Sequence, residues 1–312
     1  MLRLIAYKIL QGILMLVFVS AITFVLLANA GGDAFSALRE NPQVNAATID
    51  RLRETYGLER PLAERYLTWL TGFATGDLGE SFHFRLGVGG LVLSRLWNTV
   101  LLGGAGTLIA WMVAILLTYI AAITRSRLLG RVIGAVVLIT ASMPRIVLAL
   151  FALAVFVWSS GLAFEIQNDT LGAFVVGSLV MAVPLVALFL AQAHGEMKNA
   201  MKEECIGLAR AKGLTESTIV TRHASRFALN PLLTIFGLSL GEIVSGSVIV
   251  ETVLGWPGVG ALMVSAVFAR DVPLVMGIVV LATLAVWFGN ALADVMQLIN
   301  DRRLLDVEMV SQ

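Results

Sequence analysis

Six apolar stretches constrain this 312-residue chain more than any other feature of its sequence. They lie at about residues 9–27, 98–123, 132–158, 171–193, 231–250 and 273–299. A helix that spans a bilayer needs about 20 mostly apolar residues, so each stretch is able to cross a membrane once. Charged residues make up only 14% of the sequence, against about 25% in soluble domains. The sequence therefore predicts an all-α integral membrane protein with six transmembrane helices.

Lysine and arginine are distributed unevenly between the loops. If both termini lie inside, the short outer loops hold only Arg270, whereas the inner segments hold Arg3, Lys8, Arg125, Arg127, Arg131, Lys198, Lys202, Arg210, Lys212, Arg222, Arg226, Arg302 and Arg303. Cytoplasmic loops carry such an excess, so both ends are expected in the cytoplasm. The first apolar stretch exceeds the roughly 7–15 residues of a signal-peptide core and is interpreted as an uncleaved anchor.

These helices divide the chain into four parts. We expect an anchor helix at 1–29, an extracytoplasmic segment at 30–97, a transmembrane core at 98–299 and a cytoplasmic tail at 300–312. The core contains a long inner loop at 194–229 and a Gly/Pro-rich outer loop at 254–272. Within the extracytoplasmic segment the pattern predicts a helix at 47–56, a turn at 59–61, and irregular structure around Gly72, Gly76 and Gly79.

Motifs for chemistry on this chain are absent from the sequence. It contains no G-x-x-x-x-G-K-[ST] loop for phosphates, no H-E-x-x-H and no G-x-S-x-G. One cysteine and three scattered histidines predict neither a disulfide framework nor a metal site. We therefore expect a protein that is not an enzyme and that carries no metal or cofactor of its own.

The inner loop between the fourth and fifth stretches is the most informative segment. Ile206, Ala209 and Gly213 fall on one helical face, and small residues at 209, 211 and 213 would let another surface approach the backbone. Gly213 is expected to end one short helix, and Thr215 to cap a second. The pattern fits either a docking site for another protein or a basic loop at the membrane surface.

A family resemblance favours the docking interpretation. The run Ala209-Arg210-Ala211-Lys212-Gly213-Leu214, followed by Arg222-His223-Ala224 and Asn230-Pro231, resembles the cytoplasmic loop of the dipeptide/oligopeptide/nickel permeases of ATP-binding-cassette (ABC) transporters, in the branch of the first permease subunit. That resemblance implies that residues 209–214 form a coupling helix, which docks on an ATPase subunit. In this chain Gly207 and Leu208 stand where the general importer motif has Glu and Ala.

The resemblance covers nearly the whole chain. Matching runs are Tyr56-Gly57-Leu58-Glu59-Arg60-Pro61-Leu62, Gly76-Asp77-Leu78-Gly79-x-Ser81, Arg95-Leu96-x-Asn98-Thr99, Ser142-Met143-Pro144, Val250-Glu251-Thr252-Val253, Gly255-Trp256-Pro257-Gly258-Val259-Gly260 and Asp271-x-Pro273. Two departures are Gly31-Gly32-Asp33-Ala34, in place of Pro-Gly-Asp-Pro, and Arg302, in place of a proline. The outer residues Gly255, Trp256, Pro257, Gly258 and Gly260 are predicted to form a re-entrant or interfacial segment rather than a helix, and the resemblance implies that they face a binding protein.

Five polar residues inside the predicted helices, and one proline that frees helix carbonyls near Arg145, are candidates for a translocation path. They are Ser142, Pro144, Arg145, Glu242, Asn290 and Asp294. A charge at mid-bilayer costs at least about 2.5–3.5 kcal/mol on insertion scales, so it normally faces protein or water. The alternative interpretation is that these residues pair between helices or lie near a membrane edge.

The resemblance implies a permease subunit of an ABC importer in the inner membrane of a prokaryote. Its expected partners are a second homologous permease, two ATPase subunits that bind ATP and Mg²⁺, and a solute-binding protein that delivers di- or oligopeptides. Nickel complexes and glycans remain open as substrates. The alternative is a proton-coupled secondary transporter or channel that uses Glu242 and Asp294 as relays, although no inverted repeat typical of such carriers is visible. A membrane scaffold is a third possibility.

Overall fold

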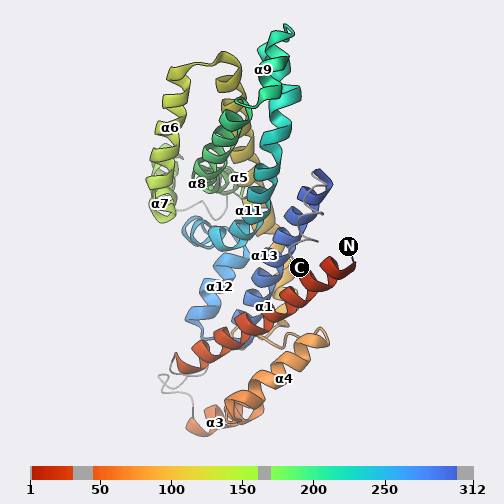
Figure 1. Ribbon diagram of the computed structural model, residues 1–312. Helices are drawn as coiled ribbons and strands as arrows, with labels where there is room; N and C mark the ends of the chain where they lie inside the picture. Colours follow the sequence, from red (N-terminus) through yellow and green to blue (C-terminus); the bar gives the residue numbers. More distant parts are fainter. Residues whose placement is uncertain (1, 31–44, 161–169, 301–312) are drawn as a thin grey trace. The chain divides into compact units, whose positions relative to one another are not determined.

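The computed structural model describes residues 2–30, 45–160 and 170–300, and within them the fold is helical. The departures at 31–34 and 302 and the tail at 301–312 lie outside the described residues. The helices are α1 Leu2–Asn29, α3 Ala46–Thr55, α4 Leu62–Ala74, α5 Val88–Thr124, α6 Arg127–Ser142, α7 Arg145–Ser160, α8 Thr170–Ala200, α9 Glu204–Ala211, α10 Glu216–Thr218, a π-helical turn Ile219–Ala224, α11 Ser225–Leu254, α12 Val259–Phe268 and α13 Val272–Asn300 (Figure 1).

Five of the described helices are long and apolar enough to cross a membrane: α1, α5, α8, α11 and α13. The pair α6 and α7 makes a sixth span if the two are counted together, in agreement with the predicted six. Several helices extend beyond the expected stretches, and α5 and α11 are two examples. α5 begins at Val88 rather than near Asn98, and α11 begins at Ser225 rather than at Pro231. Its 37 residues make α5 about 55 Å long, well beyond the roughly 30 Å of a hydrocarbon core.

The break between α6 and α7 follows from Pro144. A proline disfavours helical backbone at the preceding residue, and Met143 is extended, with φ −89° and ψ 116°. The two helices are bent by 94° at this point. Each has 16 residues, or about 24 Å, so neither spans a bilayer alone. Pro144 therefore divides the apolar stretch at 132–158 into two helices that meet at a sharp turn.

Two compact units make up the chain. One contains Met1–Asn98 and Pro257–Ala285, and the other Thr99–Trp256 and Val286–Gln312. In the second unit, α8 packs against α6, α7 and α11 (Figure 1), with Phe189, Leu190 and Met181 fully buried. The first unit has its own apolar cluster, in which Val88 of α5 meets Val259 of α12 and Leu274 of α13.

The first unit also holds the described part of the extracytoplasmic segment. α3 confirms the helix expected near 47–56. A turn follows at 56–59, with Gly57 at φ 63°, and it begins earlier than the turn expected at 59–61. Along α4, which contacts α1 (Figure 1), Tyr66 bonds to Ser20 of α1, with 3.0 Å between hydroxyl oxygens. The expectation of irregular structure is wrong for Gly72, which lies inside α4, and correct for Gly76 and Gly79, which both have positive φ.

The outer loop at 254–272 is more ordered than its composition predicts. Gly255 is left-handed, with φ 67°, and ends α11. The expectation that the segment avoids a helix is wrong from Val259 onward, where α12 runs for ten residues. Burial explains the difference, because Val259, Leu262 and Ala266 pack into the apolar cluster of the first unit. Tertiary packing outweighs weak helix propensity in short helices.

Candidate functional site

The inner loop forms a short helix with a defined end. Gly213 has φ 79°, its N–H donates to the carbonyl of Arg210 at 2.9 Å, and the N–H of Leu214 donates to the carbonyl of Ala209 at 3.2 Å. This pair of bonds is the Schellman arrangement that glycine favours after a helix. Thr215 Oγ1 accepts from the N–H of Thr218. Both local predictions, the stop at Gly213 and the cap at Thr215, are confirmed.

One detail of the expected docking face is wrong. Ile206 and Ala209 are buried in a cluster with Met197, Ile219 and Val220, so Ala209 is small because it packs against this chain. The exposed side of the loop carries Leu208, which is 59% exposed, and Leu214. Ala211, Lys212 and Gly213 are exposed as well. The surface available to a partner is therefore apolar and basic, and it consists of Leu208 and residues 211–214, which we call the α9 tip.

The second half of the loop differs from the expected separate helix. α10, the π-helical turn and α11 follow one another without interruption from Glu216 to Leu254. The end of the inner loop is therefore continuous with a membrane-spanning helix.

Glu216 joins two parts of the inner side of the second unit. Its Oε1 lies 2.7 Å from Arg125 Nη2, in the turn between α5 and α6, and 2.9 Å from Arg210 Nε on α9. Arg210 also lies 3.5 Å from Oε2 through its Nη2. Charge-assisted bonds to a guanidinium are among the stronger polar contacts, so α9 is tied to the α5–α6 turn. Sequence reasoning did not identify this link.

Two of the motifs that carry the family resemblance lie far apart in the sequence but form hydrogen bonds with each other. Asp271 is fully buried and accepts bonds from Ser81 Oγ at 2.5 Å and from the N–H of His83 at 3.0 Å. Its other oxygen accepts from the N–H of Leu274 at 3.2 Å, at the start of α13. The Gly-Asp-Leu-Gly-x-Ser and Asp-x-Pro motifs therefore act together in the first unit, where they fix the extracytoplasmic segment.

A second buried pair lies in the second unit. Thr99 Oγ1 of α5 donates to Glu251 Oε1 of α11 at 2.7 Å, and both residues are fully buried. A buried carboxylate without a partner would be costly. The motifs around residues 95–99 and 250–253 thus meet in one contact. The full burial of both side chains indicates a structural role, and neither residue was among the predicted path residues.

The outer-loop residues are held in different ways. Trp256 is buried against Phe174 of α8, with ring centroids 5.8 Å apart. The carbonyl of Pro257 accepts a bond from Asn98 Nδ2 at 2.8 Å. Gly258 and Gly260 are buried, whereas Gly255 and Pro257 are exposed. Only part of the expected binding-protein surface is therefore accessible on this chain.

Of the candidate path residues, the structure brings together Arg145 and Glu242. Arg145 Nη2 lies 3.0 Å from Glu242 Oε2, and the side chains are 20% and 45% exposed. Gly246, one turn further along α11, leaves room for this pair, because a Cβ there would overlap the Arg145 guanidinium. The pair joins two helices, as the alternative interpretation expected. The Glu242 carboxylate is nevertheless partly exposed, although it lies in an apolar helix.

The other candidates have less distinctive surroundings. Ser142 donates to the carbonyl of Leu138 in its own helix at 2.6 Å. Pro144 is exposed beside the α6–α7 bend. Asn290 is exposed on α13, and Asp294, one turn later, is half-buried.

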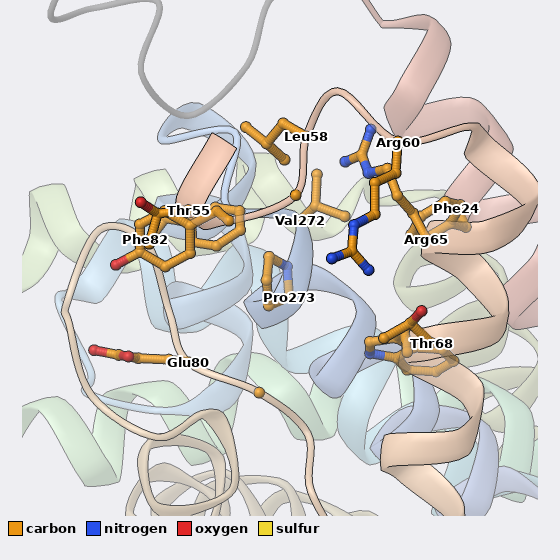
Figure 2. Close-up of a pocket in the computed structure, with 14 residues that line it drawn as sticks. Phe24, Thr55, Leu58, Arg60, Arg65, Thr68, Glu80, Phe82, Val272 and Pro273 are labelled. Carbon is orange, nitrogen blue, oxygen red and sulfur yellow. The ribbon is translucent and has the colours of Figure 1, made fainter. Parts of the chain in front are cut away.

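A cavity of about 350 Å³ lies in the first unit. Figure 2 shows Arg60 and Arg65 on one side and Glu80 and Phe82 on the other, with Pro273 of α13 between them. The Arg65 guanidinium stands over the ring of Phe24, 5.7 Å from its centroid, and Arg60 lies 3.6 Å from the exposed Glu64. Sequence reasoning did not predict this cavity.

Comparison with known proteins identifies the family. Residues 114–306 match the family described as the binding-protein-dependent transport system inner membrane component, and residues 1–84 match its N-terminal membrane component. The chain belongs to this family. It is therefore a multi-pass permease subunit of an ABC importer in a prokaryotic inner membrane, which works with other importer components, and the proton-coupled alternative is not supported.

Named relatives of this permease extend over most of its length. A Brucella suis biovar 1 protein that carries a peptide-permease name is 33% identical over 97% of this chain and 99% of the relative. The oligopeptide transport system permease protein AppB of Bacillus subtilis is 30% identical over 95% and 96%. The di/tripeptide transport system permease protein DppB of Pseudomonas aeruginosa is 31% identical over 89% and 91%.

Proposed function

We propose that this permease imports di- or oligopeptides, which an extracytoplasmic solute-binding protein delivers. The names of the relatives support the peptide substrate. In this proposal the chain forms half of the translocation path and a second, homologous permease forms the other half. Two ATPase subunits hold the ATP and Mg²⁺, so this chain carries no cofactor and no catalytic residues.

The α9 tip is the observation on which the coupling role depends. Its buried base, Ile206 and Ala209, is anchored in the second unit, and its outer side presents Leu208 and Leu214. A helix that is anchored on one side and apolar on the other is suited to insertion into a groove of a partner. Because α10, the π-helical turn and α11 are continuous, we propose that closure of the ATPase subunits moves α11 through this docking site.

Two matched variants test the docking. Leu208→Glu places a charge on the tip, and Leu67→Glu on α4 places the same charge on a leucine that is 58% exposed, in the extracytoplasmic segment. Affinity purification through a tag on this chain, followed by an ATPase assay of the eluate, should show loss of ATPase activity for Leu208→Glu only. Equal recovery of ATPase activity with both variants would contradict the proposal that the α9 tip docks on an ATPase subunit. Gly213 is a poorer choice for substitution, because any side chain there is strained at φ 79°.

The Arg145–Glu242 pair is proposed to line the path. A peptide with free termini carries one carboxylate and one ammonium group, so it is able to exchange partners with the two side chains while each charge stays paired. This exchange avoids the cost of an isolated charge in the membrane. Asn290 and Asp294 on α13, and Ser142 and Pro144 at the α6–α7 bend, are retained as further candidates.

Uptake of labelled peptides tests the substrate. Cells that lack this gene and cells complemented with it are given a labelled dipeptide, a labelled oligopeptide or a labelled nickel chelate. We expect uptake of at least one peptide to depend on the gene. Uptake of the chelate alone would contradict the peptide assignment and leave the permease assignment intact.

A further inference from the structure

A second cavity, of about 560 Å³, opens in the second unit on the side predicted to be cytoplasmic. The ends of α5 and α8, the start of α6 and one side chain of α9 form its walls. It is separate from the Arg145–Glu242 pair and from the exposed leucines of the α9 tip, none of which line it. Of the predicted coupling helix at 209–214, Arg210 lines the cavity and the other residues do not.

Positive charge dominates the lining. Arg125, Arg127, Arg131, Lys198 and Arg210 all face the cavity. The carboxylate of Glu216 neutralises part of this charge, through its bonds to Arg125 and Arg210. Among the described residues, no acidic group lies within ion-pair distance of the three other basic side chains.

Three basic groups without acidic partners surround a concave space and repel one another, so an anion inside it would relieve the repulsion. Glu196 of α8 is the acidic residue nearest to Lys198 in the sequence, and it accepts a bond from Gln192 at 3.1 Å instead. A phosphate group, with several acceptor oxygens, suits such a cluster of lysine and arginine donors.

Apolar groups complete the lining and indicate an amphiphile. Ala121, Ala122, Met197 and Met201 form part of the wall. Next to the cavity, Leu128 at the start of α6 is 70% exposed. Exposed apolar side chains continue along α5 through Ile120 and Leu116. A basic pocket at the inner end of membrane helices, continuous with an apolar surface, matches an anionic headgroup with its acyl chains.

We propose that this cavity binds the phosphate headgroup of an anionic phospholipid of the inner leaflet. Arg127, Arg131 and Lys198 hold the phosphate, and the acyl chains lie along the exposed apolar side of α5. The binding does not depend on which substrate the importer carries.

Native mass spectrometry of the complete importer, purified through a tag on this chain, tests the proposal. Phosphatidylglycerol is the probe, phosphatidylethanolamine is the lipid without net charge, and inorganic phosphate is the competing free anion. The test variant is Arg127→Gln/Arg131→Gln/Lys198→Gln. Its matched control, Lys202→Gln/Arg222→Gln/Arg226→Gln, removes the same charge from exposed positions on the same side that do not line the cavity.

We expect the test variant to bind phosphatidylglycerol about a hundredfold more weakly, because each of the three basic side chains near anionic lipid contributes about fivefold. The control should retain its affinity, and Lys198→Gln alone, the mildest change, should show about a fivefold loss. Equal losses in the two triple variants would mean general attraction to the surface and would overturn the proposal. Complete displacement of lipid by inorganic phosphate would assign the cavity to a soluble anion. Binding to the isolated chain but not to the importer would show that a partner subunit covers it.

Discussion

Replacing Gly103 by alanine should destabilise the second unit, whereas the same change at the neighbouring Gly104 should not. Both residues lie in α5. A Cβ on Gly103 would lie 2.5 Å from Ile243 Cγ2, 3.1 Å from its Cβ and 3.3 Å from its Cα, on α11. A Cβ on Gly104 would meet nothing within 4 Å. The two substitutions therefore have the same chemistry and differ only in packing.

The magnitude follows from the distances. Carbon atoms pack best at about 3.5–4.0 Å, so the new methyl group at 103 would be about 1 Å too close. Ile243 is β-branched and has little rotamer freedom in a helix, so α5 and α11 must separate. Overpacking of this kind costs about 1–3 kcal/mol, while alanine in place of glycine gains up to about 1 kcal/mol in a helix. At 104 only the gain applies.

Thermal unfolding of the detergent-solubilised chain, followed by fluorescence-detected size exclusion, measures the difference. With about 2–4 °C of Tm per kcal/mol for a protein of this size class, Gly103→Ala should melt about 5 °C below Gly104→Ala. Equal melting temperatures, or a lower one for Gly104→Ala, would refute the close approach of α5 and α11 at this point.

Three further predictions concern polar contacts. Asp271→Asn should destabilise the extracytoplasmic segment by about 1–3 kcal/mol, because buried donors lose a charged acceptor. Limited proteolysis should then cleave this segment faster. The control Asp50→Asn, at an exposed position, should leave the cleavage rate unchanged. Glu216→Gln breaks two partly exposed ion pairs, so the free energy of unfolding should change by no more than about 1 kcal/mol. Amide hydrogen exchange in α9 should become faster. Unchanged exchange would contradict the link that Glu216 makes between α9 and the α5–α6 turn. Gly246→Ala should lower peptide uptake by displacing the arginine–glutamate pair in the membrane without loss of assembly, and Ser245→Ala, at an exposed neighbouring position, should leave uptake unchanged.

Local patterns carried much of the prediction for the inner loop. A glycine needs no neighbour to adopt positive φ, and a threonine caps the helix that directly follows it. The stop at Gly213 and the cap at Thr215 were therefore predictable from adjacent residues. The orientation of Ala209 was not, because it depends on Ile219 and Val220, which return from the other side of the turn.

The sequence by itself determined that this chain spans a membrane several times, because apolar length and the scarcity of charge are properties of single segments. It also located the break at Pro144, since the restriction acts on the residue before it. Only the tertiary structure decided what the polar motifs do. Ser81 and Asp271 are 190 residues apart, and Thr99 and Glu251 are 152 apart. Their pairing requires packed helices, and so does α12, whose apolar residues become helical because they are buried in the first unit.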